Sequence, residues 1–146
     1  MPYELPAGPC PVCRYLDGSA PWAPIHVGRT AAAYVAPRQR TPGTMLVVPA
    51  RHVATLAELT RGEAEELWRL VRAVMSAAWE VFEPQSFHVS QYTGLVTGET
   101  LAHLHWRVEP RYPDELPYAP IDELPKPSLA ERTRTAERIR AHLRPA

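Results

Sequence analysis

The amino-acid sequence predicts an α+β domain built on an antiparallel sheet, and the order of its segments supports this prediction. Strand-like stretches come first, between residues 24 and 48. One long stretch with helical spacing follows over residues 60–82, and strand-like stretches return between residues 86 and 110. A doubly wound parallel sheet would instead need a helix after almost every strand.

Three strands are expected before the long helix. The segment PIHVGRTAAAYVAP indicates two short strands that form a hairpin around Gly28 and Arg29. A Pro-Gly turn in TPGTMLVVPARH then precedes a third strand over residues 45–48, which Pro49 ends.

The long helix has the clearest signals in the sequence. Thr60 and Glu63 form a capping box at its start, in which each side chain satisfies a free backbone N–H of the other residue. Pro84 ends the helix. Apolar residues recur at helical spacing between these limits, so one face of the helix should pack on the sheet. These residues are Ala64, Leu67, Trp68, Val71, Val74, Met75 and Ala78.

After the helix, SFHVSQY is an alternating strand and TGLVTGE is a glycine-rich turn. The stretch LAHLHWRVEP at residues 101–110 predicts a last strand, whose successive side chains point to opposite faces. The apolar face belongs to the core and carries Ala102, Leu104, Trp106 and Val108. The other face carries Leu101, His103, His105, Arg107 and Glu109. This polar face is either a solvated sheet surface or a site.

Proline-rich segments flank the strands and helix on both sides. The chain holds 17 prolines, which cluster at residues 2–24 and 110–127 and predict extended, irregular flanks. A second capping box, Ser128 with Glu131, begins a basic C-terminal helix. The sequence therefore divides into a domain over residues 1–112, with a proline-rich segment at 1–24, and a linker with a helix over residues 113–146.

Composition narrows the classes of function. The 146-residue chain has a formal net charge of zero and a pI near 7.0, so its global electrostatics do not favour nucleic acid as a partner. No apolar run reaches the roughly 20 residues of a membrane span, and the first residues lack the form of a signal peptide. We therefore expect a cytoplasmic protein with no membrane partner. The arginines of the C-terminal helix are a weaker candidate for an interaction surface, because Glu131 and Glu137 balance them on a solvated face.

The two cysteines of the chain, Cys10 and Cys13, form a Cys-x-x-Cys pair. Two thiolates at this spacing bind one zinc ion when two more ligands join them. His52, after a strand end, and His103, on the polar face, would complete a Cys2His2 site. The spacing is not that of a zinc finger, and a redox dithiol or two idle thiols are the alternatives.

His105 and Arg107 follow His103 on the polar face. The imidazole of His105 is a further metal ligand, a surface group, or a nucleophile that attacks phosphorus while its other nitrogen stays protonated. The planar guanidinium of Arg107 suits phosphate oxygens, although it could equally pair with Glu109 two residues along.

Three segments of the chain together resemble the histidine triad (HIT) superfamily. They are PGTMLVVPARH, LAELTRGE, and FHVSQYTGLVTGETLAHLHWRVEPRY, and the resemblance covers roughly residues 10–112. The pattern of that family is Pro-Gly-His, a strand, Pro-x-x-His, a helix, and then His-x-His-x-His leading to Pro-Arg. The resemblance implies a five-stranded antiparallel sheet with one long helix packed on it, and it implies a homodimer.

The resemblance also implies roles for individual residues. Branches with an early Cys-x-x-Cys hold a structural zinc ion through that pair, the Pro-x-x-His histidine and the first triad histidine. These correspond to Cys10, Cys13, His52 and His103. The middle histidine of the family is a nucleophile that forms a covalent nucleotidyl-histidine, and it corresponds to His105. The substrate would be a nucleotide or a nucleotide-like small molecule.

The sequence also departs from the family pattern. Arg107 replaces the third histidine, Thr44 replaces the histidine of Pro-Gly-His, and Glu99 stands where glutamine is usual. The expected substrate-binding residues are Gln91, Thr93, Glu99 and Thr100, with His105 and Arg107 as the catalytic pair. A carboxylate at residue 99 would repel phosphate oxygens unless it were protonated or paired, for example with Arg107.

Two hypotheses follow from these matches and departures. The first is a nucleotidyl hydrolase or transferase that acts through His105 on a nucleoside phosphate. The second is a protein of the same fold whose chemistry is lost or altered, which binds a nucleotide or acts on another substrate and keeps zinc only for structure.

Overall fold

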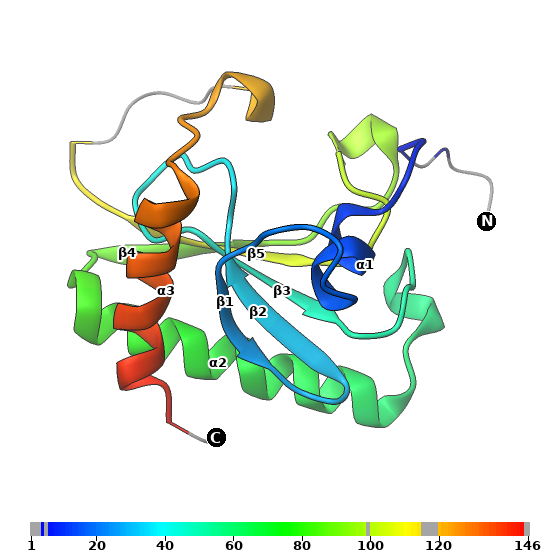
Figure 1. Cartoon of the computed structure of the whole chain (residues 1–146), viewed down its shortest axis with the longest axis horizontal. Helices are drawn as coiled ribbons and strands as arrows, with labels where there is room; N and C mark the ends of the chain where they lie inside the picture. The colour runs from blue at the N-terminus through cyan, green and yellow to red at the C-terminus, as the bar shows by residue number, and fades with distance from the viewer. Residues whose placement is uncertain (1–3, 5, 99, 115–119, 145–146) are drawn as a thin grey trace.

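The computed structural model describes residues 4, 6–98, 100–114 and 120–144. Within these residues the chain forms a five-stranded antiparallel sheet in the order β1-β2-β3-β5-β4, which confirms the predicted α+β fold (Figure 1). The strands are β1 (Pro24–Val27), β2 (Ala31–Val35), β3 (Met45–Pro49), β4 (Ser86–Ser90) and β5 (Trp106–Arg111). The helices are α1 (Pro11–Leu16), α2 (Arg61–Phe82) and α3 (Leu129–His142), with short 3-10 turns η1 (Leu56–Glu58), η2 (Leu95–Thr97) and η3 (Ile121–Glu123).

Helix α2 begins and ends where the sequence predicts. The hydroxyl of Thr60 accepts a hydrogen bond from the backbone N–H of Glu63, and the Glu63 carboxylate accepts one from the N–H of Thr60. Glu83 closes the helix in the left-handed conformation, with a φ of 47°, directly before Pro84. No helix among the described residues is long and apolar enough to cross a membrane.

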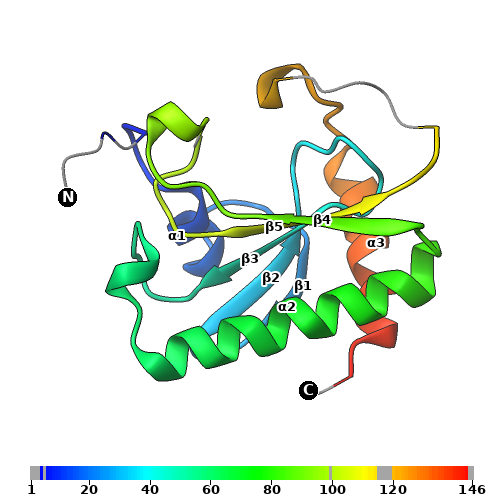
Figure 2. The same ribbon diagram turned by 180° about the vertical axis from the view of Figure 1, so that it is seen from behind.

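Helices α2 and α3 cover the same face of the sheet, where most of the core lies (Figure 2). Buried residues of α2, such as Leu67 and Val74, pack against strand residues such as Val47 and Val108. The alternation of β5 is as predicted, because Trp106 and Val108 face this core while Arg107 and Glu109 face the other side. The opposite face of the sheet is covered in part by α1 and carries a smaller apolar cluster.

Helix α3 is part of the main core rather than a detached tail. Its Ala136 and Ile139 are buried against the sheet and α2. The guanidinium of Arg140 donates hydrogen bonds to the backbone carbonyls of Pro24 and Ile25 at the edge strand β1. The basic side of α3 therefore has a structural use.

Two expectations about local structure were wrong. The proline-rich N-terminal flank is not wholly irregular, because residues 11–16 form α1 with Cys10 as its N-cap. Proline fits the first position of a helix, where its missing N–H costs nothing. The last strand does not begin at residue 101 but at Trp106. Residues 101–105 leave the ladder because the N–H of Leu104 bonds to the carbonyl of Val53 at 2.7 Å instead of to β3.

The interaction between Arg51 and Glu63 generates a prediction about acid stability. The hydrogen bond from Arg51, followed by that from the Thr60 N–H, lowers the pKa of Glu63 from 4.5 to about 2. Since this pKa is depressed on folding, its contribution to stability is present above pH 4.5 and is lost as the pH falls towards 2. We expect Glu63→Gln to lower the melting temperature at pH 7 by several degrees, and the difference from wild type to shrink between pH 4.5 and 2.

Circular dichroism melts across this pH range would measure the effect. Glu65→Gln is the matched control, because Glu65 pairs with Arg61 on the exposed side of the same helical turn. An equal, pH-independent loss in both variants would contradict the assignment.

Candidate functional site

Four side chains from distant parts of the sequence converge beside α1. The potential ligand atoms of Cys10, Cys13, His52 and His103 all lie within 4.8 Å of one another. The Sγ of Cys10 is 3.4 Å from Nδ1 of His103, and the Sγ of Cys13 is 3.3 Å from Nδ1 of His52. Tetrahedral zinc, with bonds of about 2.3 Å to sulfur and 2.0–2.1 Å to nitrogen, places neighbouring ligand atoms about 3.5 Å apart. The four residues can therefore hold a metal ion.

Hydrogen bonds with the local backbone position the side chains of this cluster. Cys10 caps α1, and its Sγ accepts the N–H of Cys13 at 3.5 Å, so the helical turn brings the two thiols together. Nε2 of His103 lies 2.8 Å from the carbonyl of Pro49 and donates to it, which leaves Nδ1 unprotonated towards the cysteines. Burial lowers the pKa of His103 to about 4, so the ring is neutral near pH 7.

The charge balance of the cluster also suits a cation. Burial, followed by the hydrogen bond and charge of Cys10, raises the pKa of Cys13 to about 11. Two adjacent thiolates are therefore unfavourable unless a positive charge lies between them. The loop that carries His52 is held by Arg51, which pairs with Glu63 at 2.9 Å and donates to the carbonyl of Glu58 at 2.7 Å.

His105 lies directly before β5 and is 8% exposed. Its Nδ1 is 2.8 Å from the carbonyl oxygen of His103 and donates to it. This hydrogen bond fixes the tautomer, so Nε2 carries the free lone pair. Burial lowers the pKa of His105, and the nearby charge of Arg107 lowers it further, so the ring is neutral near pH 7.

Arg107 is held in one orientation on the polar face of β5. Its Nε donates to Oε1 of Glu109 at 2.8 Å, and its Nη2 donates to the carbonyl of Arg38 at 2.7 Å. Glu109 is buried, and its second oxygen lies 3.3 Å from Nδ1 of His88 on β4. The alternative pairing that the sequence leaves open, Arg107 with Glu109, is the one observed.

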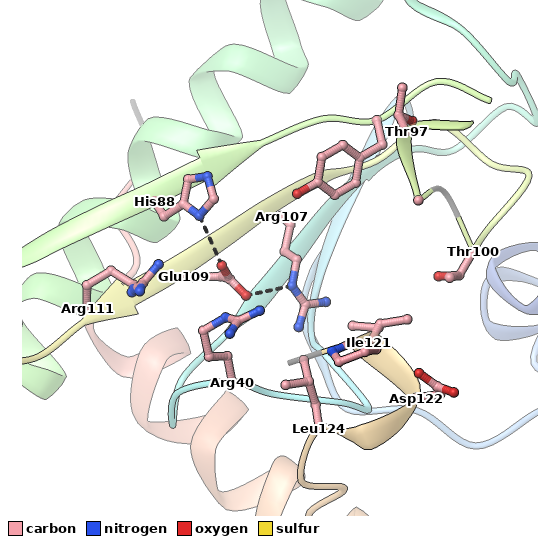
Figure 3. Close-up of a pocket in the computed structure, with 13 residues that line it drawn as sticks. Arg40, His88, Thr97, Thr100, Arg107, Glu109, Arg111, Ile121, Asp122 and Leu124 are labelled. Atoms are coloured by element: carbon pink, nitrogen blue, oxygen red, sulfur yellow. Dashed lines mark hydrogen bonds and ion pairs between the residues drawn. The ribbon is translucent and has the colours of Figure 1, made fainter. Parts of the chain in front are cut away.

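A cavity of about 350 Å³ opens over these residues (Figure 3). Residues of β4 and β5 form its floor. Its sides are formed by the loop before β3, the turn around η2, and η3. Among the described residues, the charged and ionisable ones that line it are Arg40, His88, Tyr92, Arg107, Glu109, Arg111 and Asp122. His105 does not line the cavity itself and lies two residues before Arg107.

Of the predicted substrate-binding residues, the structure places one at the cavity and two away from it. Thr100 lines the cavity, together with Gly98 and Thr97. Gln91 and Thr93 do not line it. The Nε2 of Gln91 donates to the carbonyl of Tyr92 and to the hydroxyl of Thr93, so these side chains hold the turn after β4. Glu99 lies outside the described residues.

Several lining residues are absent from the sequence prediction. His88 enters because the antiparallel register places it opposite Glu109. The alternation of SFHVSQY predicts the strand that carries His88, but not the register of that strand against β5. Arg40, Ile121 and Asp122 come from loops in which no pattern in the sequence points towards the site.

Comparisons with known proteins identify a family and several relatives that this chain is similar to. The HIT domain family matches residues 29–114. The chain is 27% identical over 103 residues to Protein hit of Bacillus subtilis, covering 70% of this chain and 71% of that one. It is 32% identical over 83 residues to the asymmetrical bis(5'-nucleosyl)-tetraphosphatase of Schizosaccharomyces pombe, covering 57% of this chain and 46% of that one. It is 38% identical over 72 residues to an AP-4-A phosphorylase of Mycobacterium tuberculosis, covering 49% and 37%. The chain thus spans less than half of the two enzymes.

Solved structures have the same fold. A HIT-like protein from Bartonella henselae superimposes with a TM-score of 0.82 at 18% identity, covering 96% of this chain and all 100% of that one. A zinc-bound histidine triad family protein from Mycobacterium smegmatis has a TM-score of 0.75 at 21% identity, covering 91% of both chains.

Proposed function

Since the chain belongs to the HIT domain family, we propose that it is a nucleotidyl hydrolase or transferase that acts on a nucleoside phosphate through a covalent nucleotidyl-histidine at His105. Relatives named as a tetraphosphatase and as a phosphorylase support a nucleotide substrate. The substrate is a small molecule, and nucleic acid and membranes are not its partners.

The observation that carries this proposal is the hydrogen bond between His105 Nδ1 and the carbonyl of His103. An imidazole is a good nucleophile towards phosphorus when one nitrogen is held protonated and the other presents a lone pair. The acceptor is the backbone carbonyl of His103, so the orientation of the ring does not depend on any other side chain. Arg107 and Thr100 then supply donors in the neighbouring cavity for phosphate oxygens.

The reaction proceeds in two displacements. Nε2 of His105 attacks the α-phosphorus, a phosphorus–nitrogen bond forms, and the bond from phosphorus to the leaving group breaks with its electron pair. Water or another acceptor then attacks the same phosphorus, forms a phosphorus–oxygen bond, and returns the electron pair to Nε2. The acceptor's proton passes to solvent.

One observation favours altered chemistry as a second candidate. Glu109 and the Arg38 carbonyl take up two of the N–H groups of Arg107, which stands where the family pattern has a histidine. A fixed guanidinium donates hydrogen bonds but does not transfer a proton, because guanidinium groups do not lose their proton in proteins. A leaving group that needs a proton would then depart slowly, and one that is stable as an anion would be favoured.

The proposal predicts a covalent adduct. Brief incubation of the full chain with adenylate donors should add the mass of one nucleoside monophosphate, and intact-protein mass spectrometry should detect it. His105→Asn should form no adduct and should lose at least a thousandfold in turnover. His26→Asn, in β1, is the matched control and should form the adduct like the wild type.

No adduct and no turnover with dinucleoside polyphosphates, phosphoramidates and nucleotide sugars would favour the second candidate. An adduct that persists in His105→Asn would place the nucleophile elsewhere.

We further propose that Cys10, Cys13, His52 and His103 hold one structural zinc ion. Zinc would supply a fixed crosslink between α1, the end of β3 and the segment before β5. All four protein ligands are used, which leaves no open position of the kind that catalytic zinc needs.

Elemental analysis of the purified chain should find about one zinc per chain, and Cys13→Ser should reduce it at least fivefold. Chelation should lower the melting temperature, and more zinc should be released at lower pH because protons compete for the ligands. His142→Ala, an exposed histidine on α3, is the control. Full stability with no zinc would contradict the assignment.

We also propose that the chain forms a homodimer through β4 and the adjacent part of α2. Among the described residues, strand β4 lies at the edge of the sheet and pairs with β5. Beside it, Trp79 of α2 is 52% exposed and packs on Phe87 of β4, with ring centroids 5.7 Å apart. An exposed edge with adjacent aromatic surface is a template for pairing with a second copy.

Light scattering during gel filtration should give twice the mass of the chain, and Trp79→Arg should shift it to the monomer mass. Val27→Thr is the control, since Val27 is also an exposed apolar residue but lies on the other edge strand, β1. A monomer mass for the wild type would refute the dimer.

A further inference from the structure

His105 lies in the segment that leads into β5, just before the residues that pair in the sheet. The pairing of β5 with β3 ends with Trp106 opposite Val47. Before this pair, the N–H of Leu104 bonds to the carbonyl of Val53 at 2.7 Å. Side-chain contacts of this segment therefore contribute to the position of the backbone that orients His105.

The cluster of potential metal ligands holds both sides of this contact. His52 directly precedes Val53, and His103 directly precedes Leu104. A metal ion bound by the two histidines and the two cysteines would therefore clamp the two segments beside their backbone hydrogen bond. His103 also supplies the carbonyl that accepts from Nδ1 of His105. The metal site is thus continuous with the hydrogen bond that orients the proposed nucleophile.

Cys10 and Cys13 are placed as a reversible disulfide requires. Cys10 caps α1 and Cys13 lies on its first turn, where side chains three residues apart are neighbours. Their sulfur atoms lie within 4.8 Å of each other. Cysteines on one helical turn have the short Cα separation that a disulfide needs. They are the two cysteines of the whole chain, so no other disulfide competes within it.

The cluster has an exposed edge. His103 is 0% exposed on its inner side, whereas His52 is exposed. Nδ1 of His52 lies 3.3 Å from Sγ of Cys13, and both cysteines are partly exposed. A small oxidant in solvent therefore reaches Cys13 beside the ring of His52.

We propose that Cys10 and Cys13 are a site of reversible oxidation by peroxides, and that their disulfide releases the metal ion and removes its hold on the segment of His105. This inference rests on the proposed function and adds regulation of the same site. Structural zinc needs four ligands, and the disulfide leaves the two histidines alone. Once the clamp is lost, the backbone at His103 can shift, and a misplacement of about 1 Å costs a reacting group on the order of a hundredfold in rate.

The bonds and electrons of the oxidation balance with one molecule of peroxide. The thiolate of Cys13 attacks one oxygen of hydrogen peroxide, the oxygen–oxygen bond breaks, and hydroxide leaves with the electron pair, which gives a sulfenic acid. The thiolate of Cys10 then attacks this sulfur, a sulfur–sulfur bond forms, and a second hydroxide leaves. Solvent protons convert both hydroxides to water. A thiol reductant reverses the change by disulfide exchange.

Hydrogen peroxide added to the zinc-loaded full chain tests the oxidation without any nucleotide. A chromogenic zinc chelator should record the release of about one zinc ion per chain. Intact-protein mass spectrometry should show the loss of two hydrogen atoms, and a thiol reductant with added zinc should restore both the mass and the zinc. Retention of zinc and of both thiols under peroxide would overturn the proposal.

The state of His105 is measured in the same samples. Its Nδ1–H is buried and hydrogen-bonded at 2.8 Å, so it should give a separate, slowly exchanging proton NMR signal. Peroxide should shift or broaden this signal and should slow formation of the nucleotidyl adduct by at least about tenfold. An unchanged signal in a chain that has lost its zinc would break the link to His105.

Two variants assign the effect to the cysteines. Cys13→His prevents the disulfide and offers zinc a nitrogen ligand in place of sulfur, so peroxide should change neither its zinc content nor its His105 signal. Met75→Leu is the control for oxidation of methionine, since Met75 is partly buried on α2, and it should respond like the wild type. A response that persists in Cys13→His, or that vanishes in Met75→Leu, would assign the effect to other residues.

The two proposals fail in different ways. Zinc release and a changed His105 signal, in a chain that forms no adduct even when reduced, would retain the oxidation site and reject the covalent mechanism. An adduct that forms equally fast in the reduced and the oxidised chain would reject the regulation and retain the mechanism.

Discussion

His103 connects the cluster of potential metal ligands to His105. Its Nδ1 faces Cys10 and Cys13, its Nε2 donates to the carbonyl of Pro49, and its own carbonyl accepts from Nδ1 of His105. Each of these contacts fixes a proton position, because a ring nitrogen that donates forces the other to act as acceptor or ligand. The orientation of His105 thus depends on where the backbone at His103 is held. Residues 101–105 lie outside the sheet for the same reason. If they paired regularly with β3, His103 would lie away from the cysteines.

A second constraint is the buried carboxylate of Glu109. A buried charge is costly unless it is paired, and Arg107 and His88 provide that pairing. An arginine at position 107 also requires a carboxylate or carbonyl to hold its long side chain, and the Arg38 carbonyl and Glu109 do so together. The replacement of histidine by arginine is therefore not an isolated change. It comes with partners that hold a positive side chain in one orientation at this position.

Local rules account for the parts of the fold that the sequence predicts. The capping boxes at Thr60 and Ser128 act within four residues, and the alternation along β5 needs only the pleat of one strand. The ligand set could also be proposed, because two cysteines need two more donors. What could not be predicted depends on pairing between distant segments. No pattern places His88 opposite Glu109, and none shows that Leu104 bonds to Val53 and thereby delays the start of β5. The loop residues that close the cavity have no periodicity at all.

The residues of the site come from two parts of the chain, one inside and one outside the segment that matches the family. His105, Arg107 and Thr100 lie within residues 29–114, which match the family, whereas η3 lies outside that match. Hydrogen bonds nevertheless connect η3 and Pro125 to the loop before β3. Arg38 donates to the carbonyl of Asp122 at 2.8 Å, and the carbonyl of Pro125 accepts from the N–H of Gln39 at 2.9 Å. Hydrogen bonds therefore join the segment that carries Arg40 and the segment that carries Asp122 into one wall of the cavity. The hydrogen bond that orients His105 lies outside this wall. The orientation of His105 and the lining of the cavity thus depend on separate sets of backbone contacts.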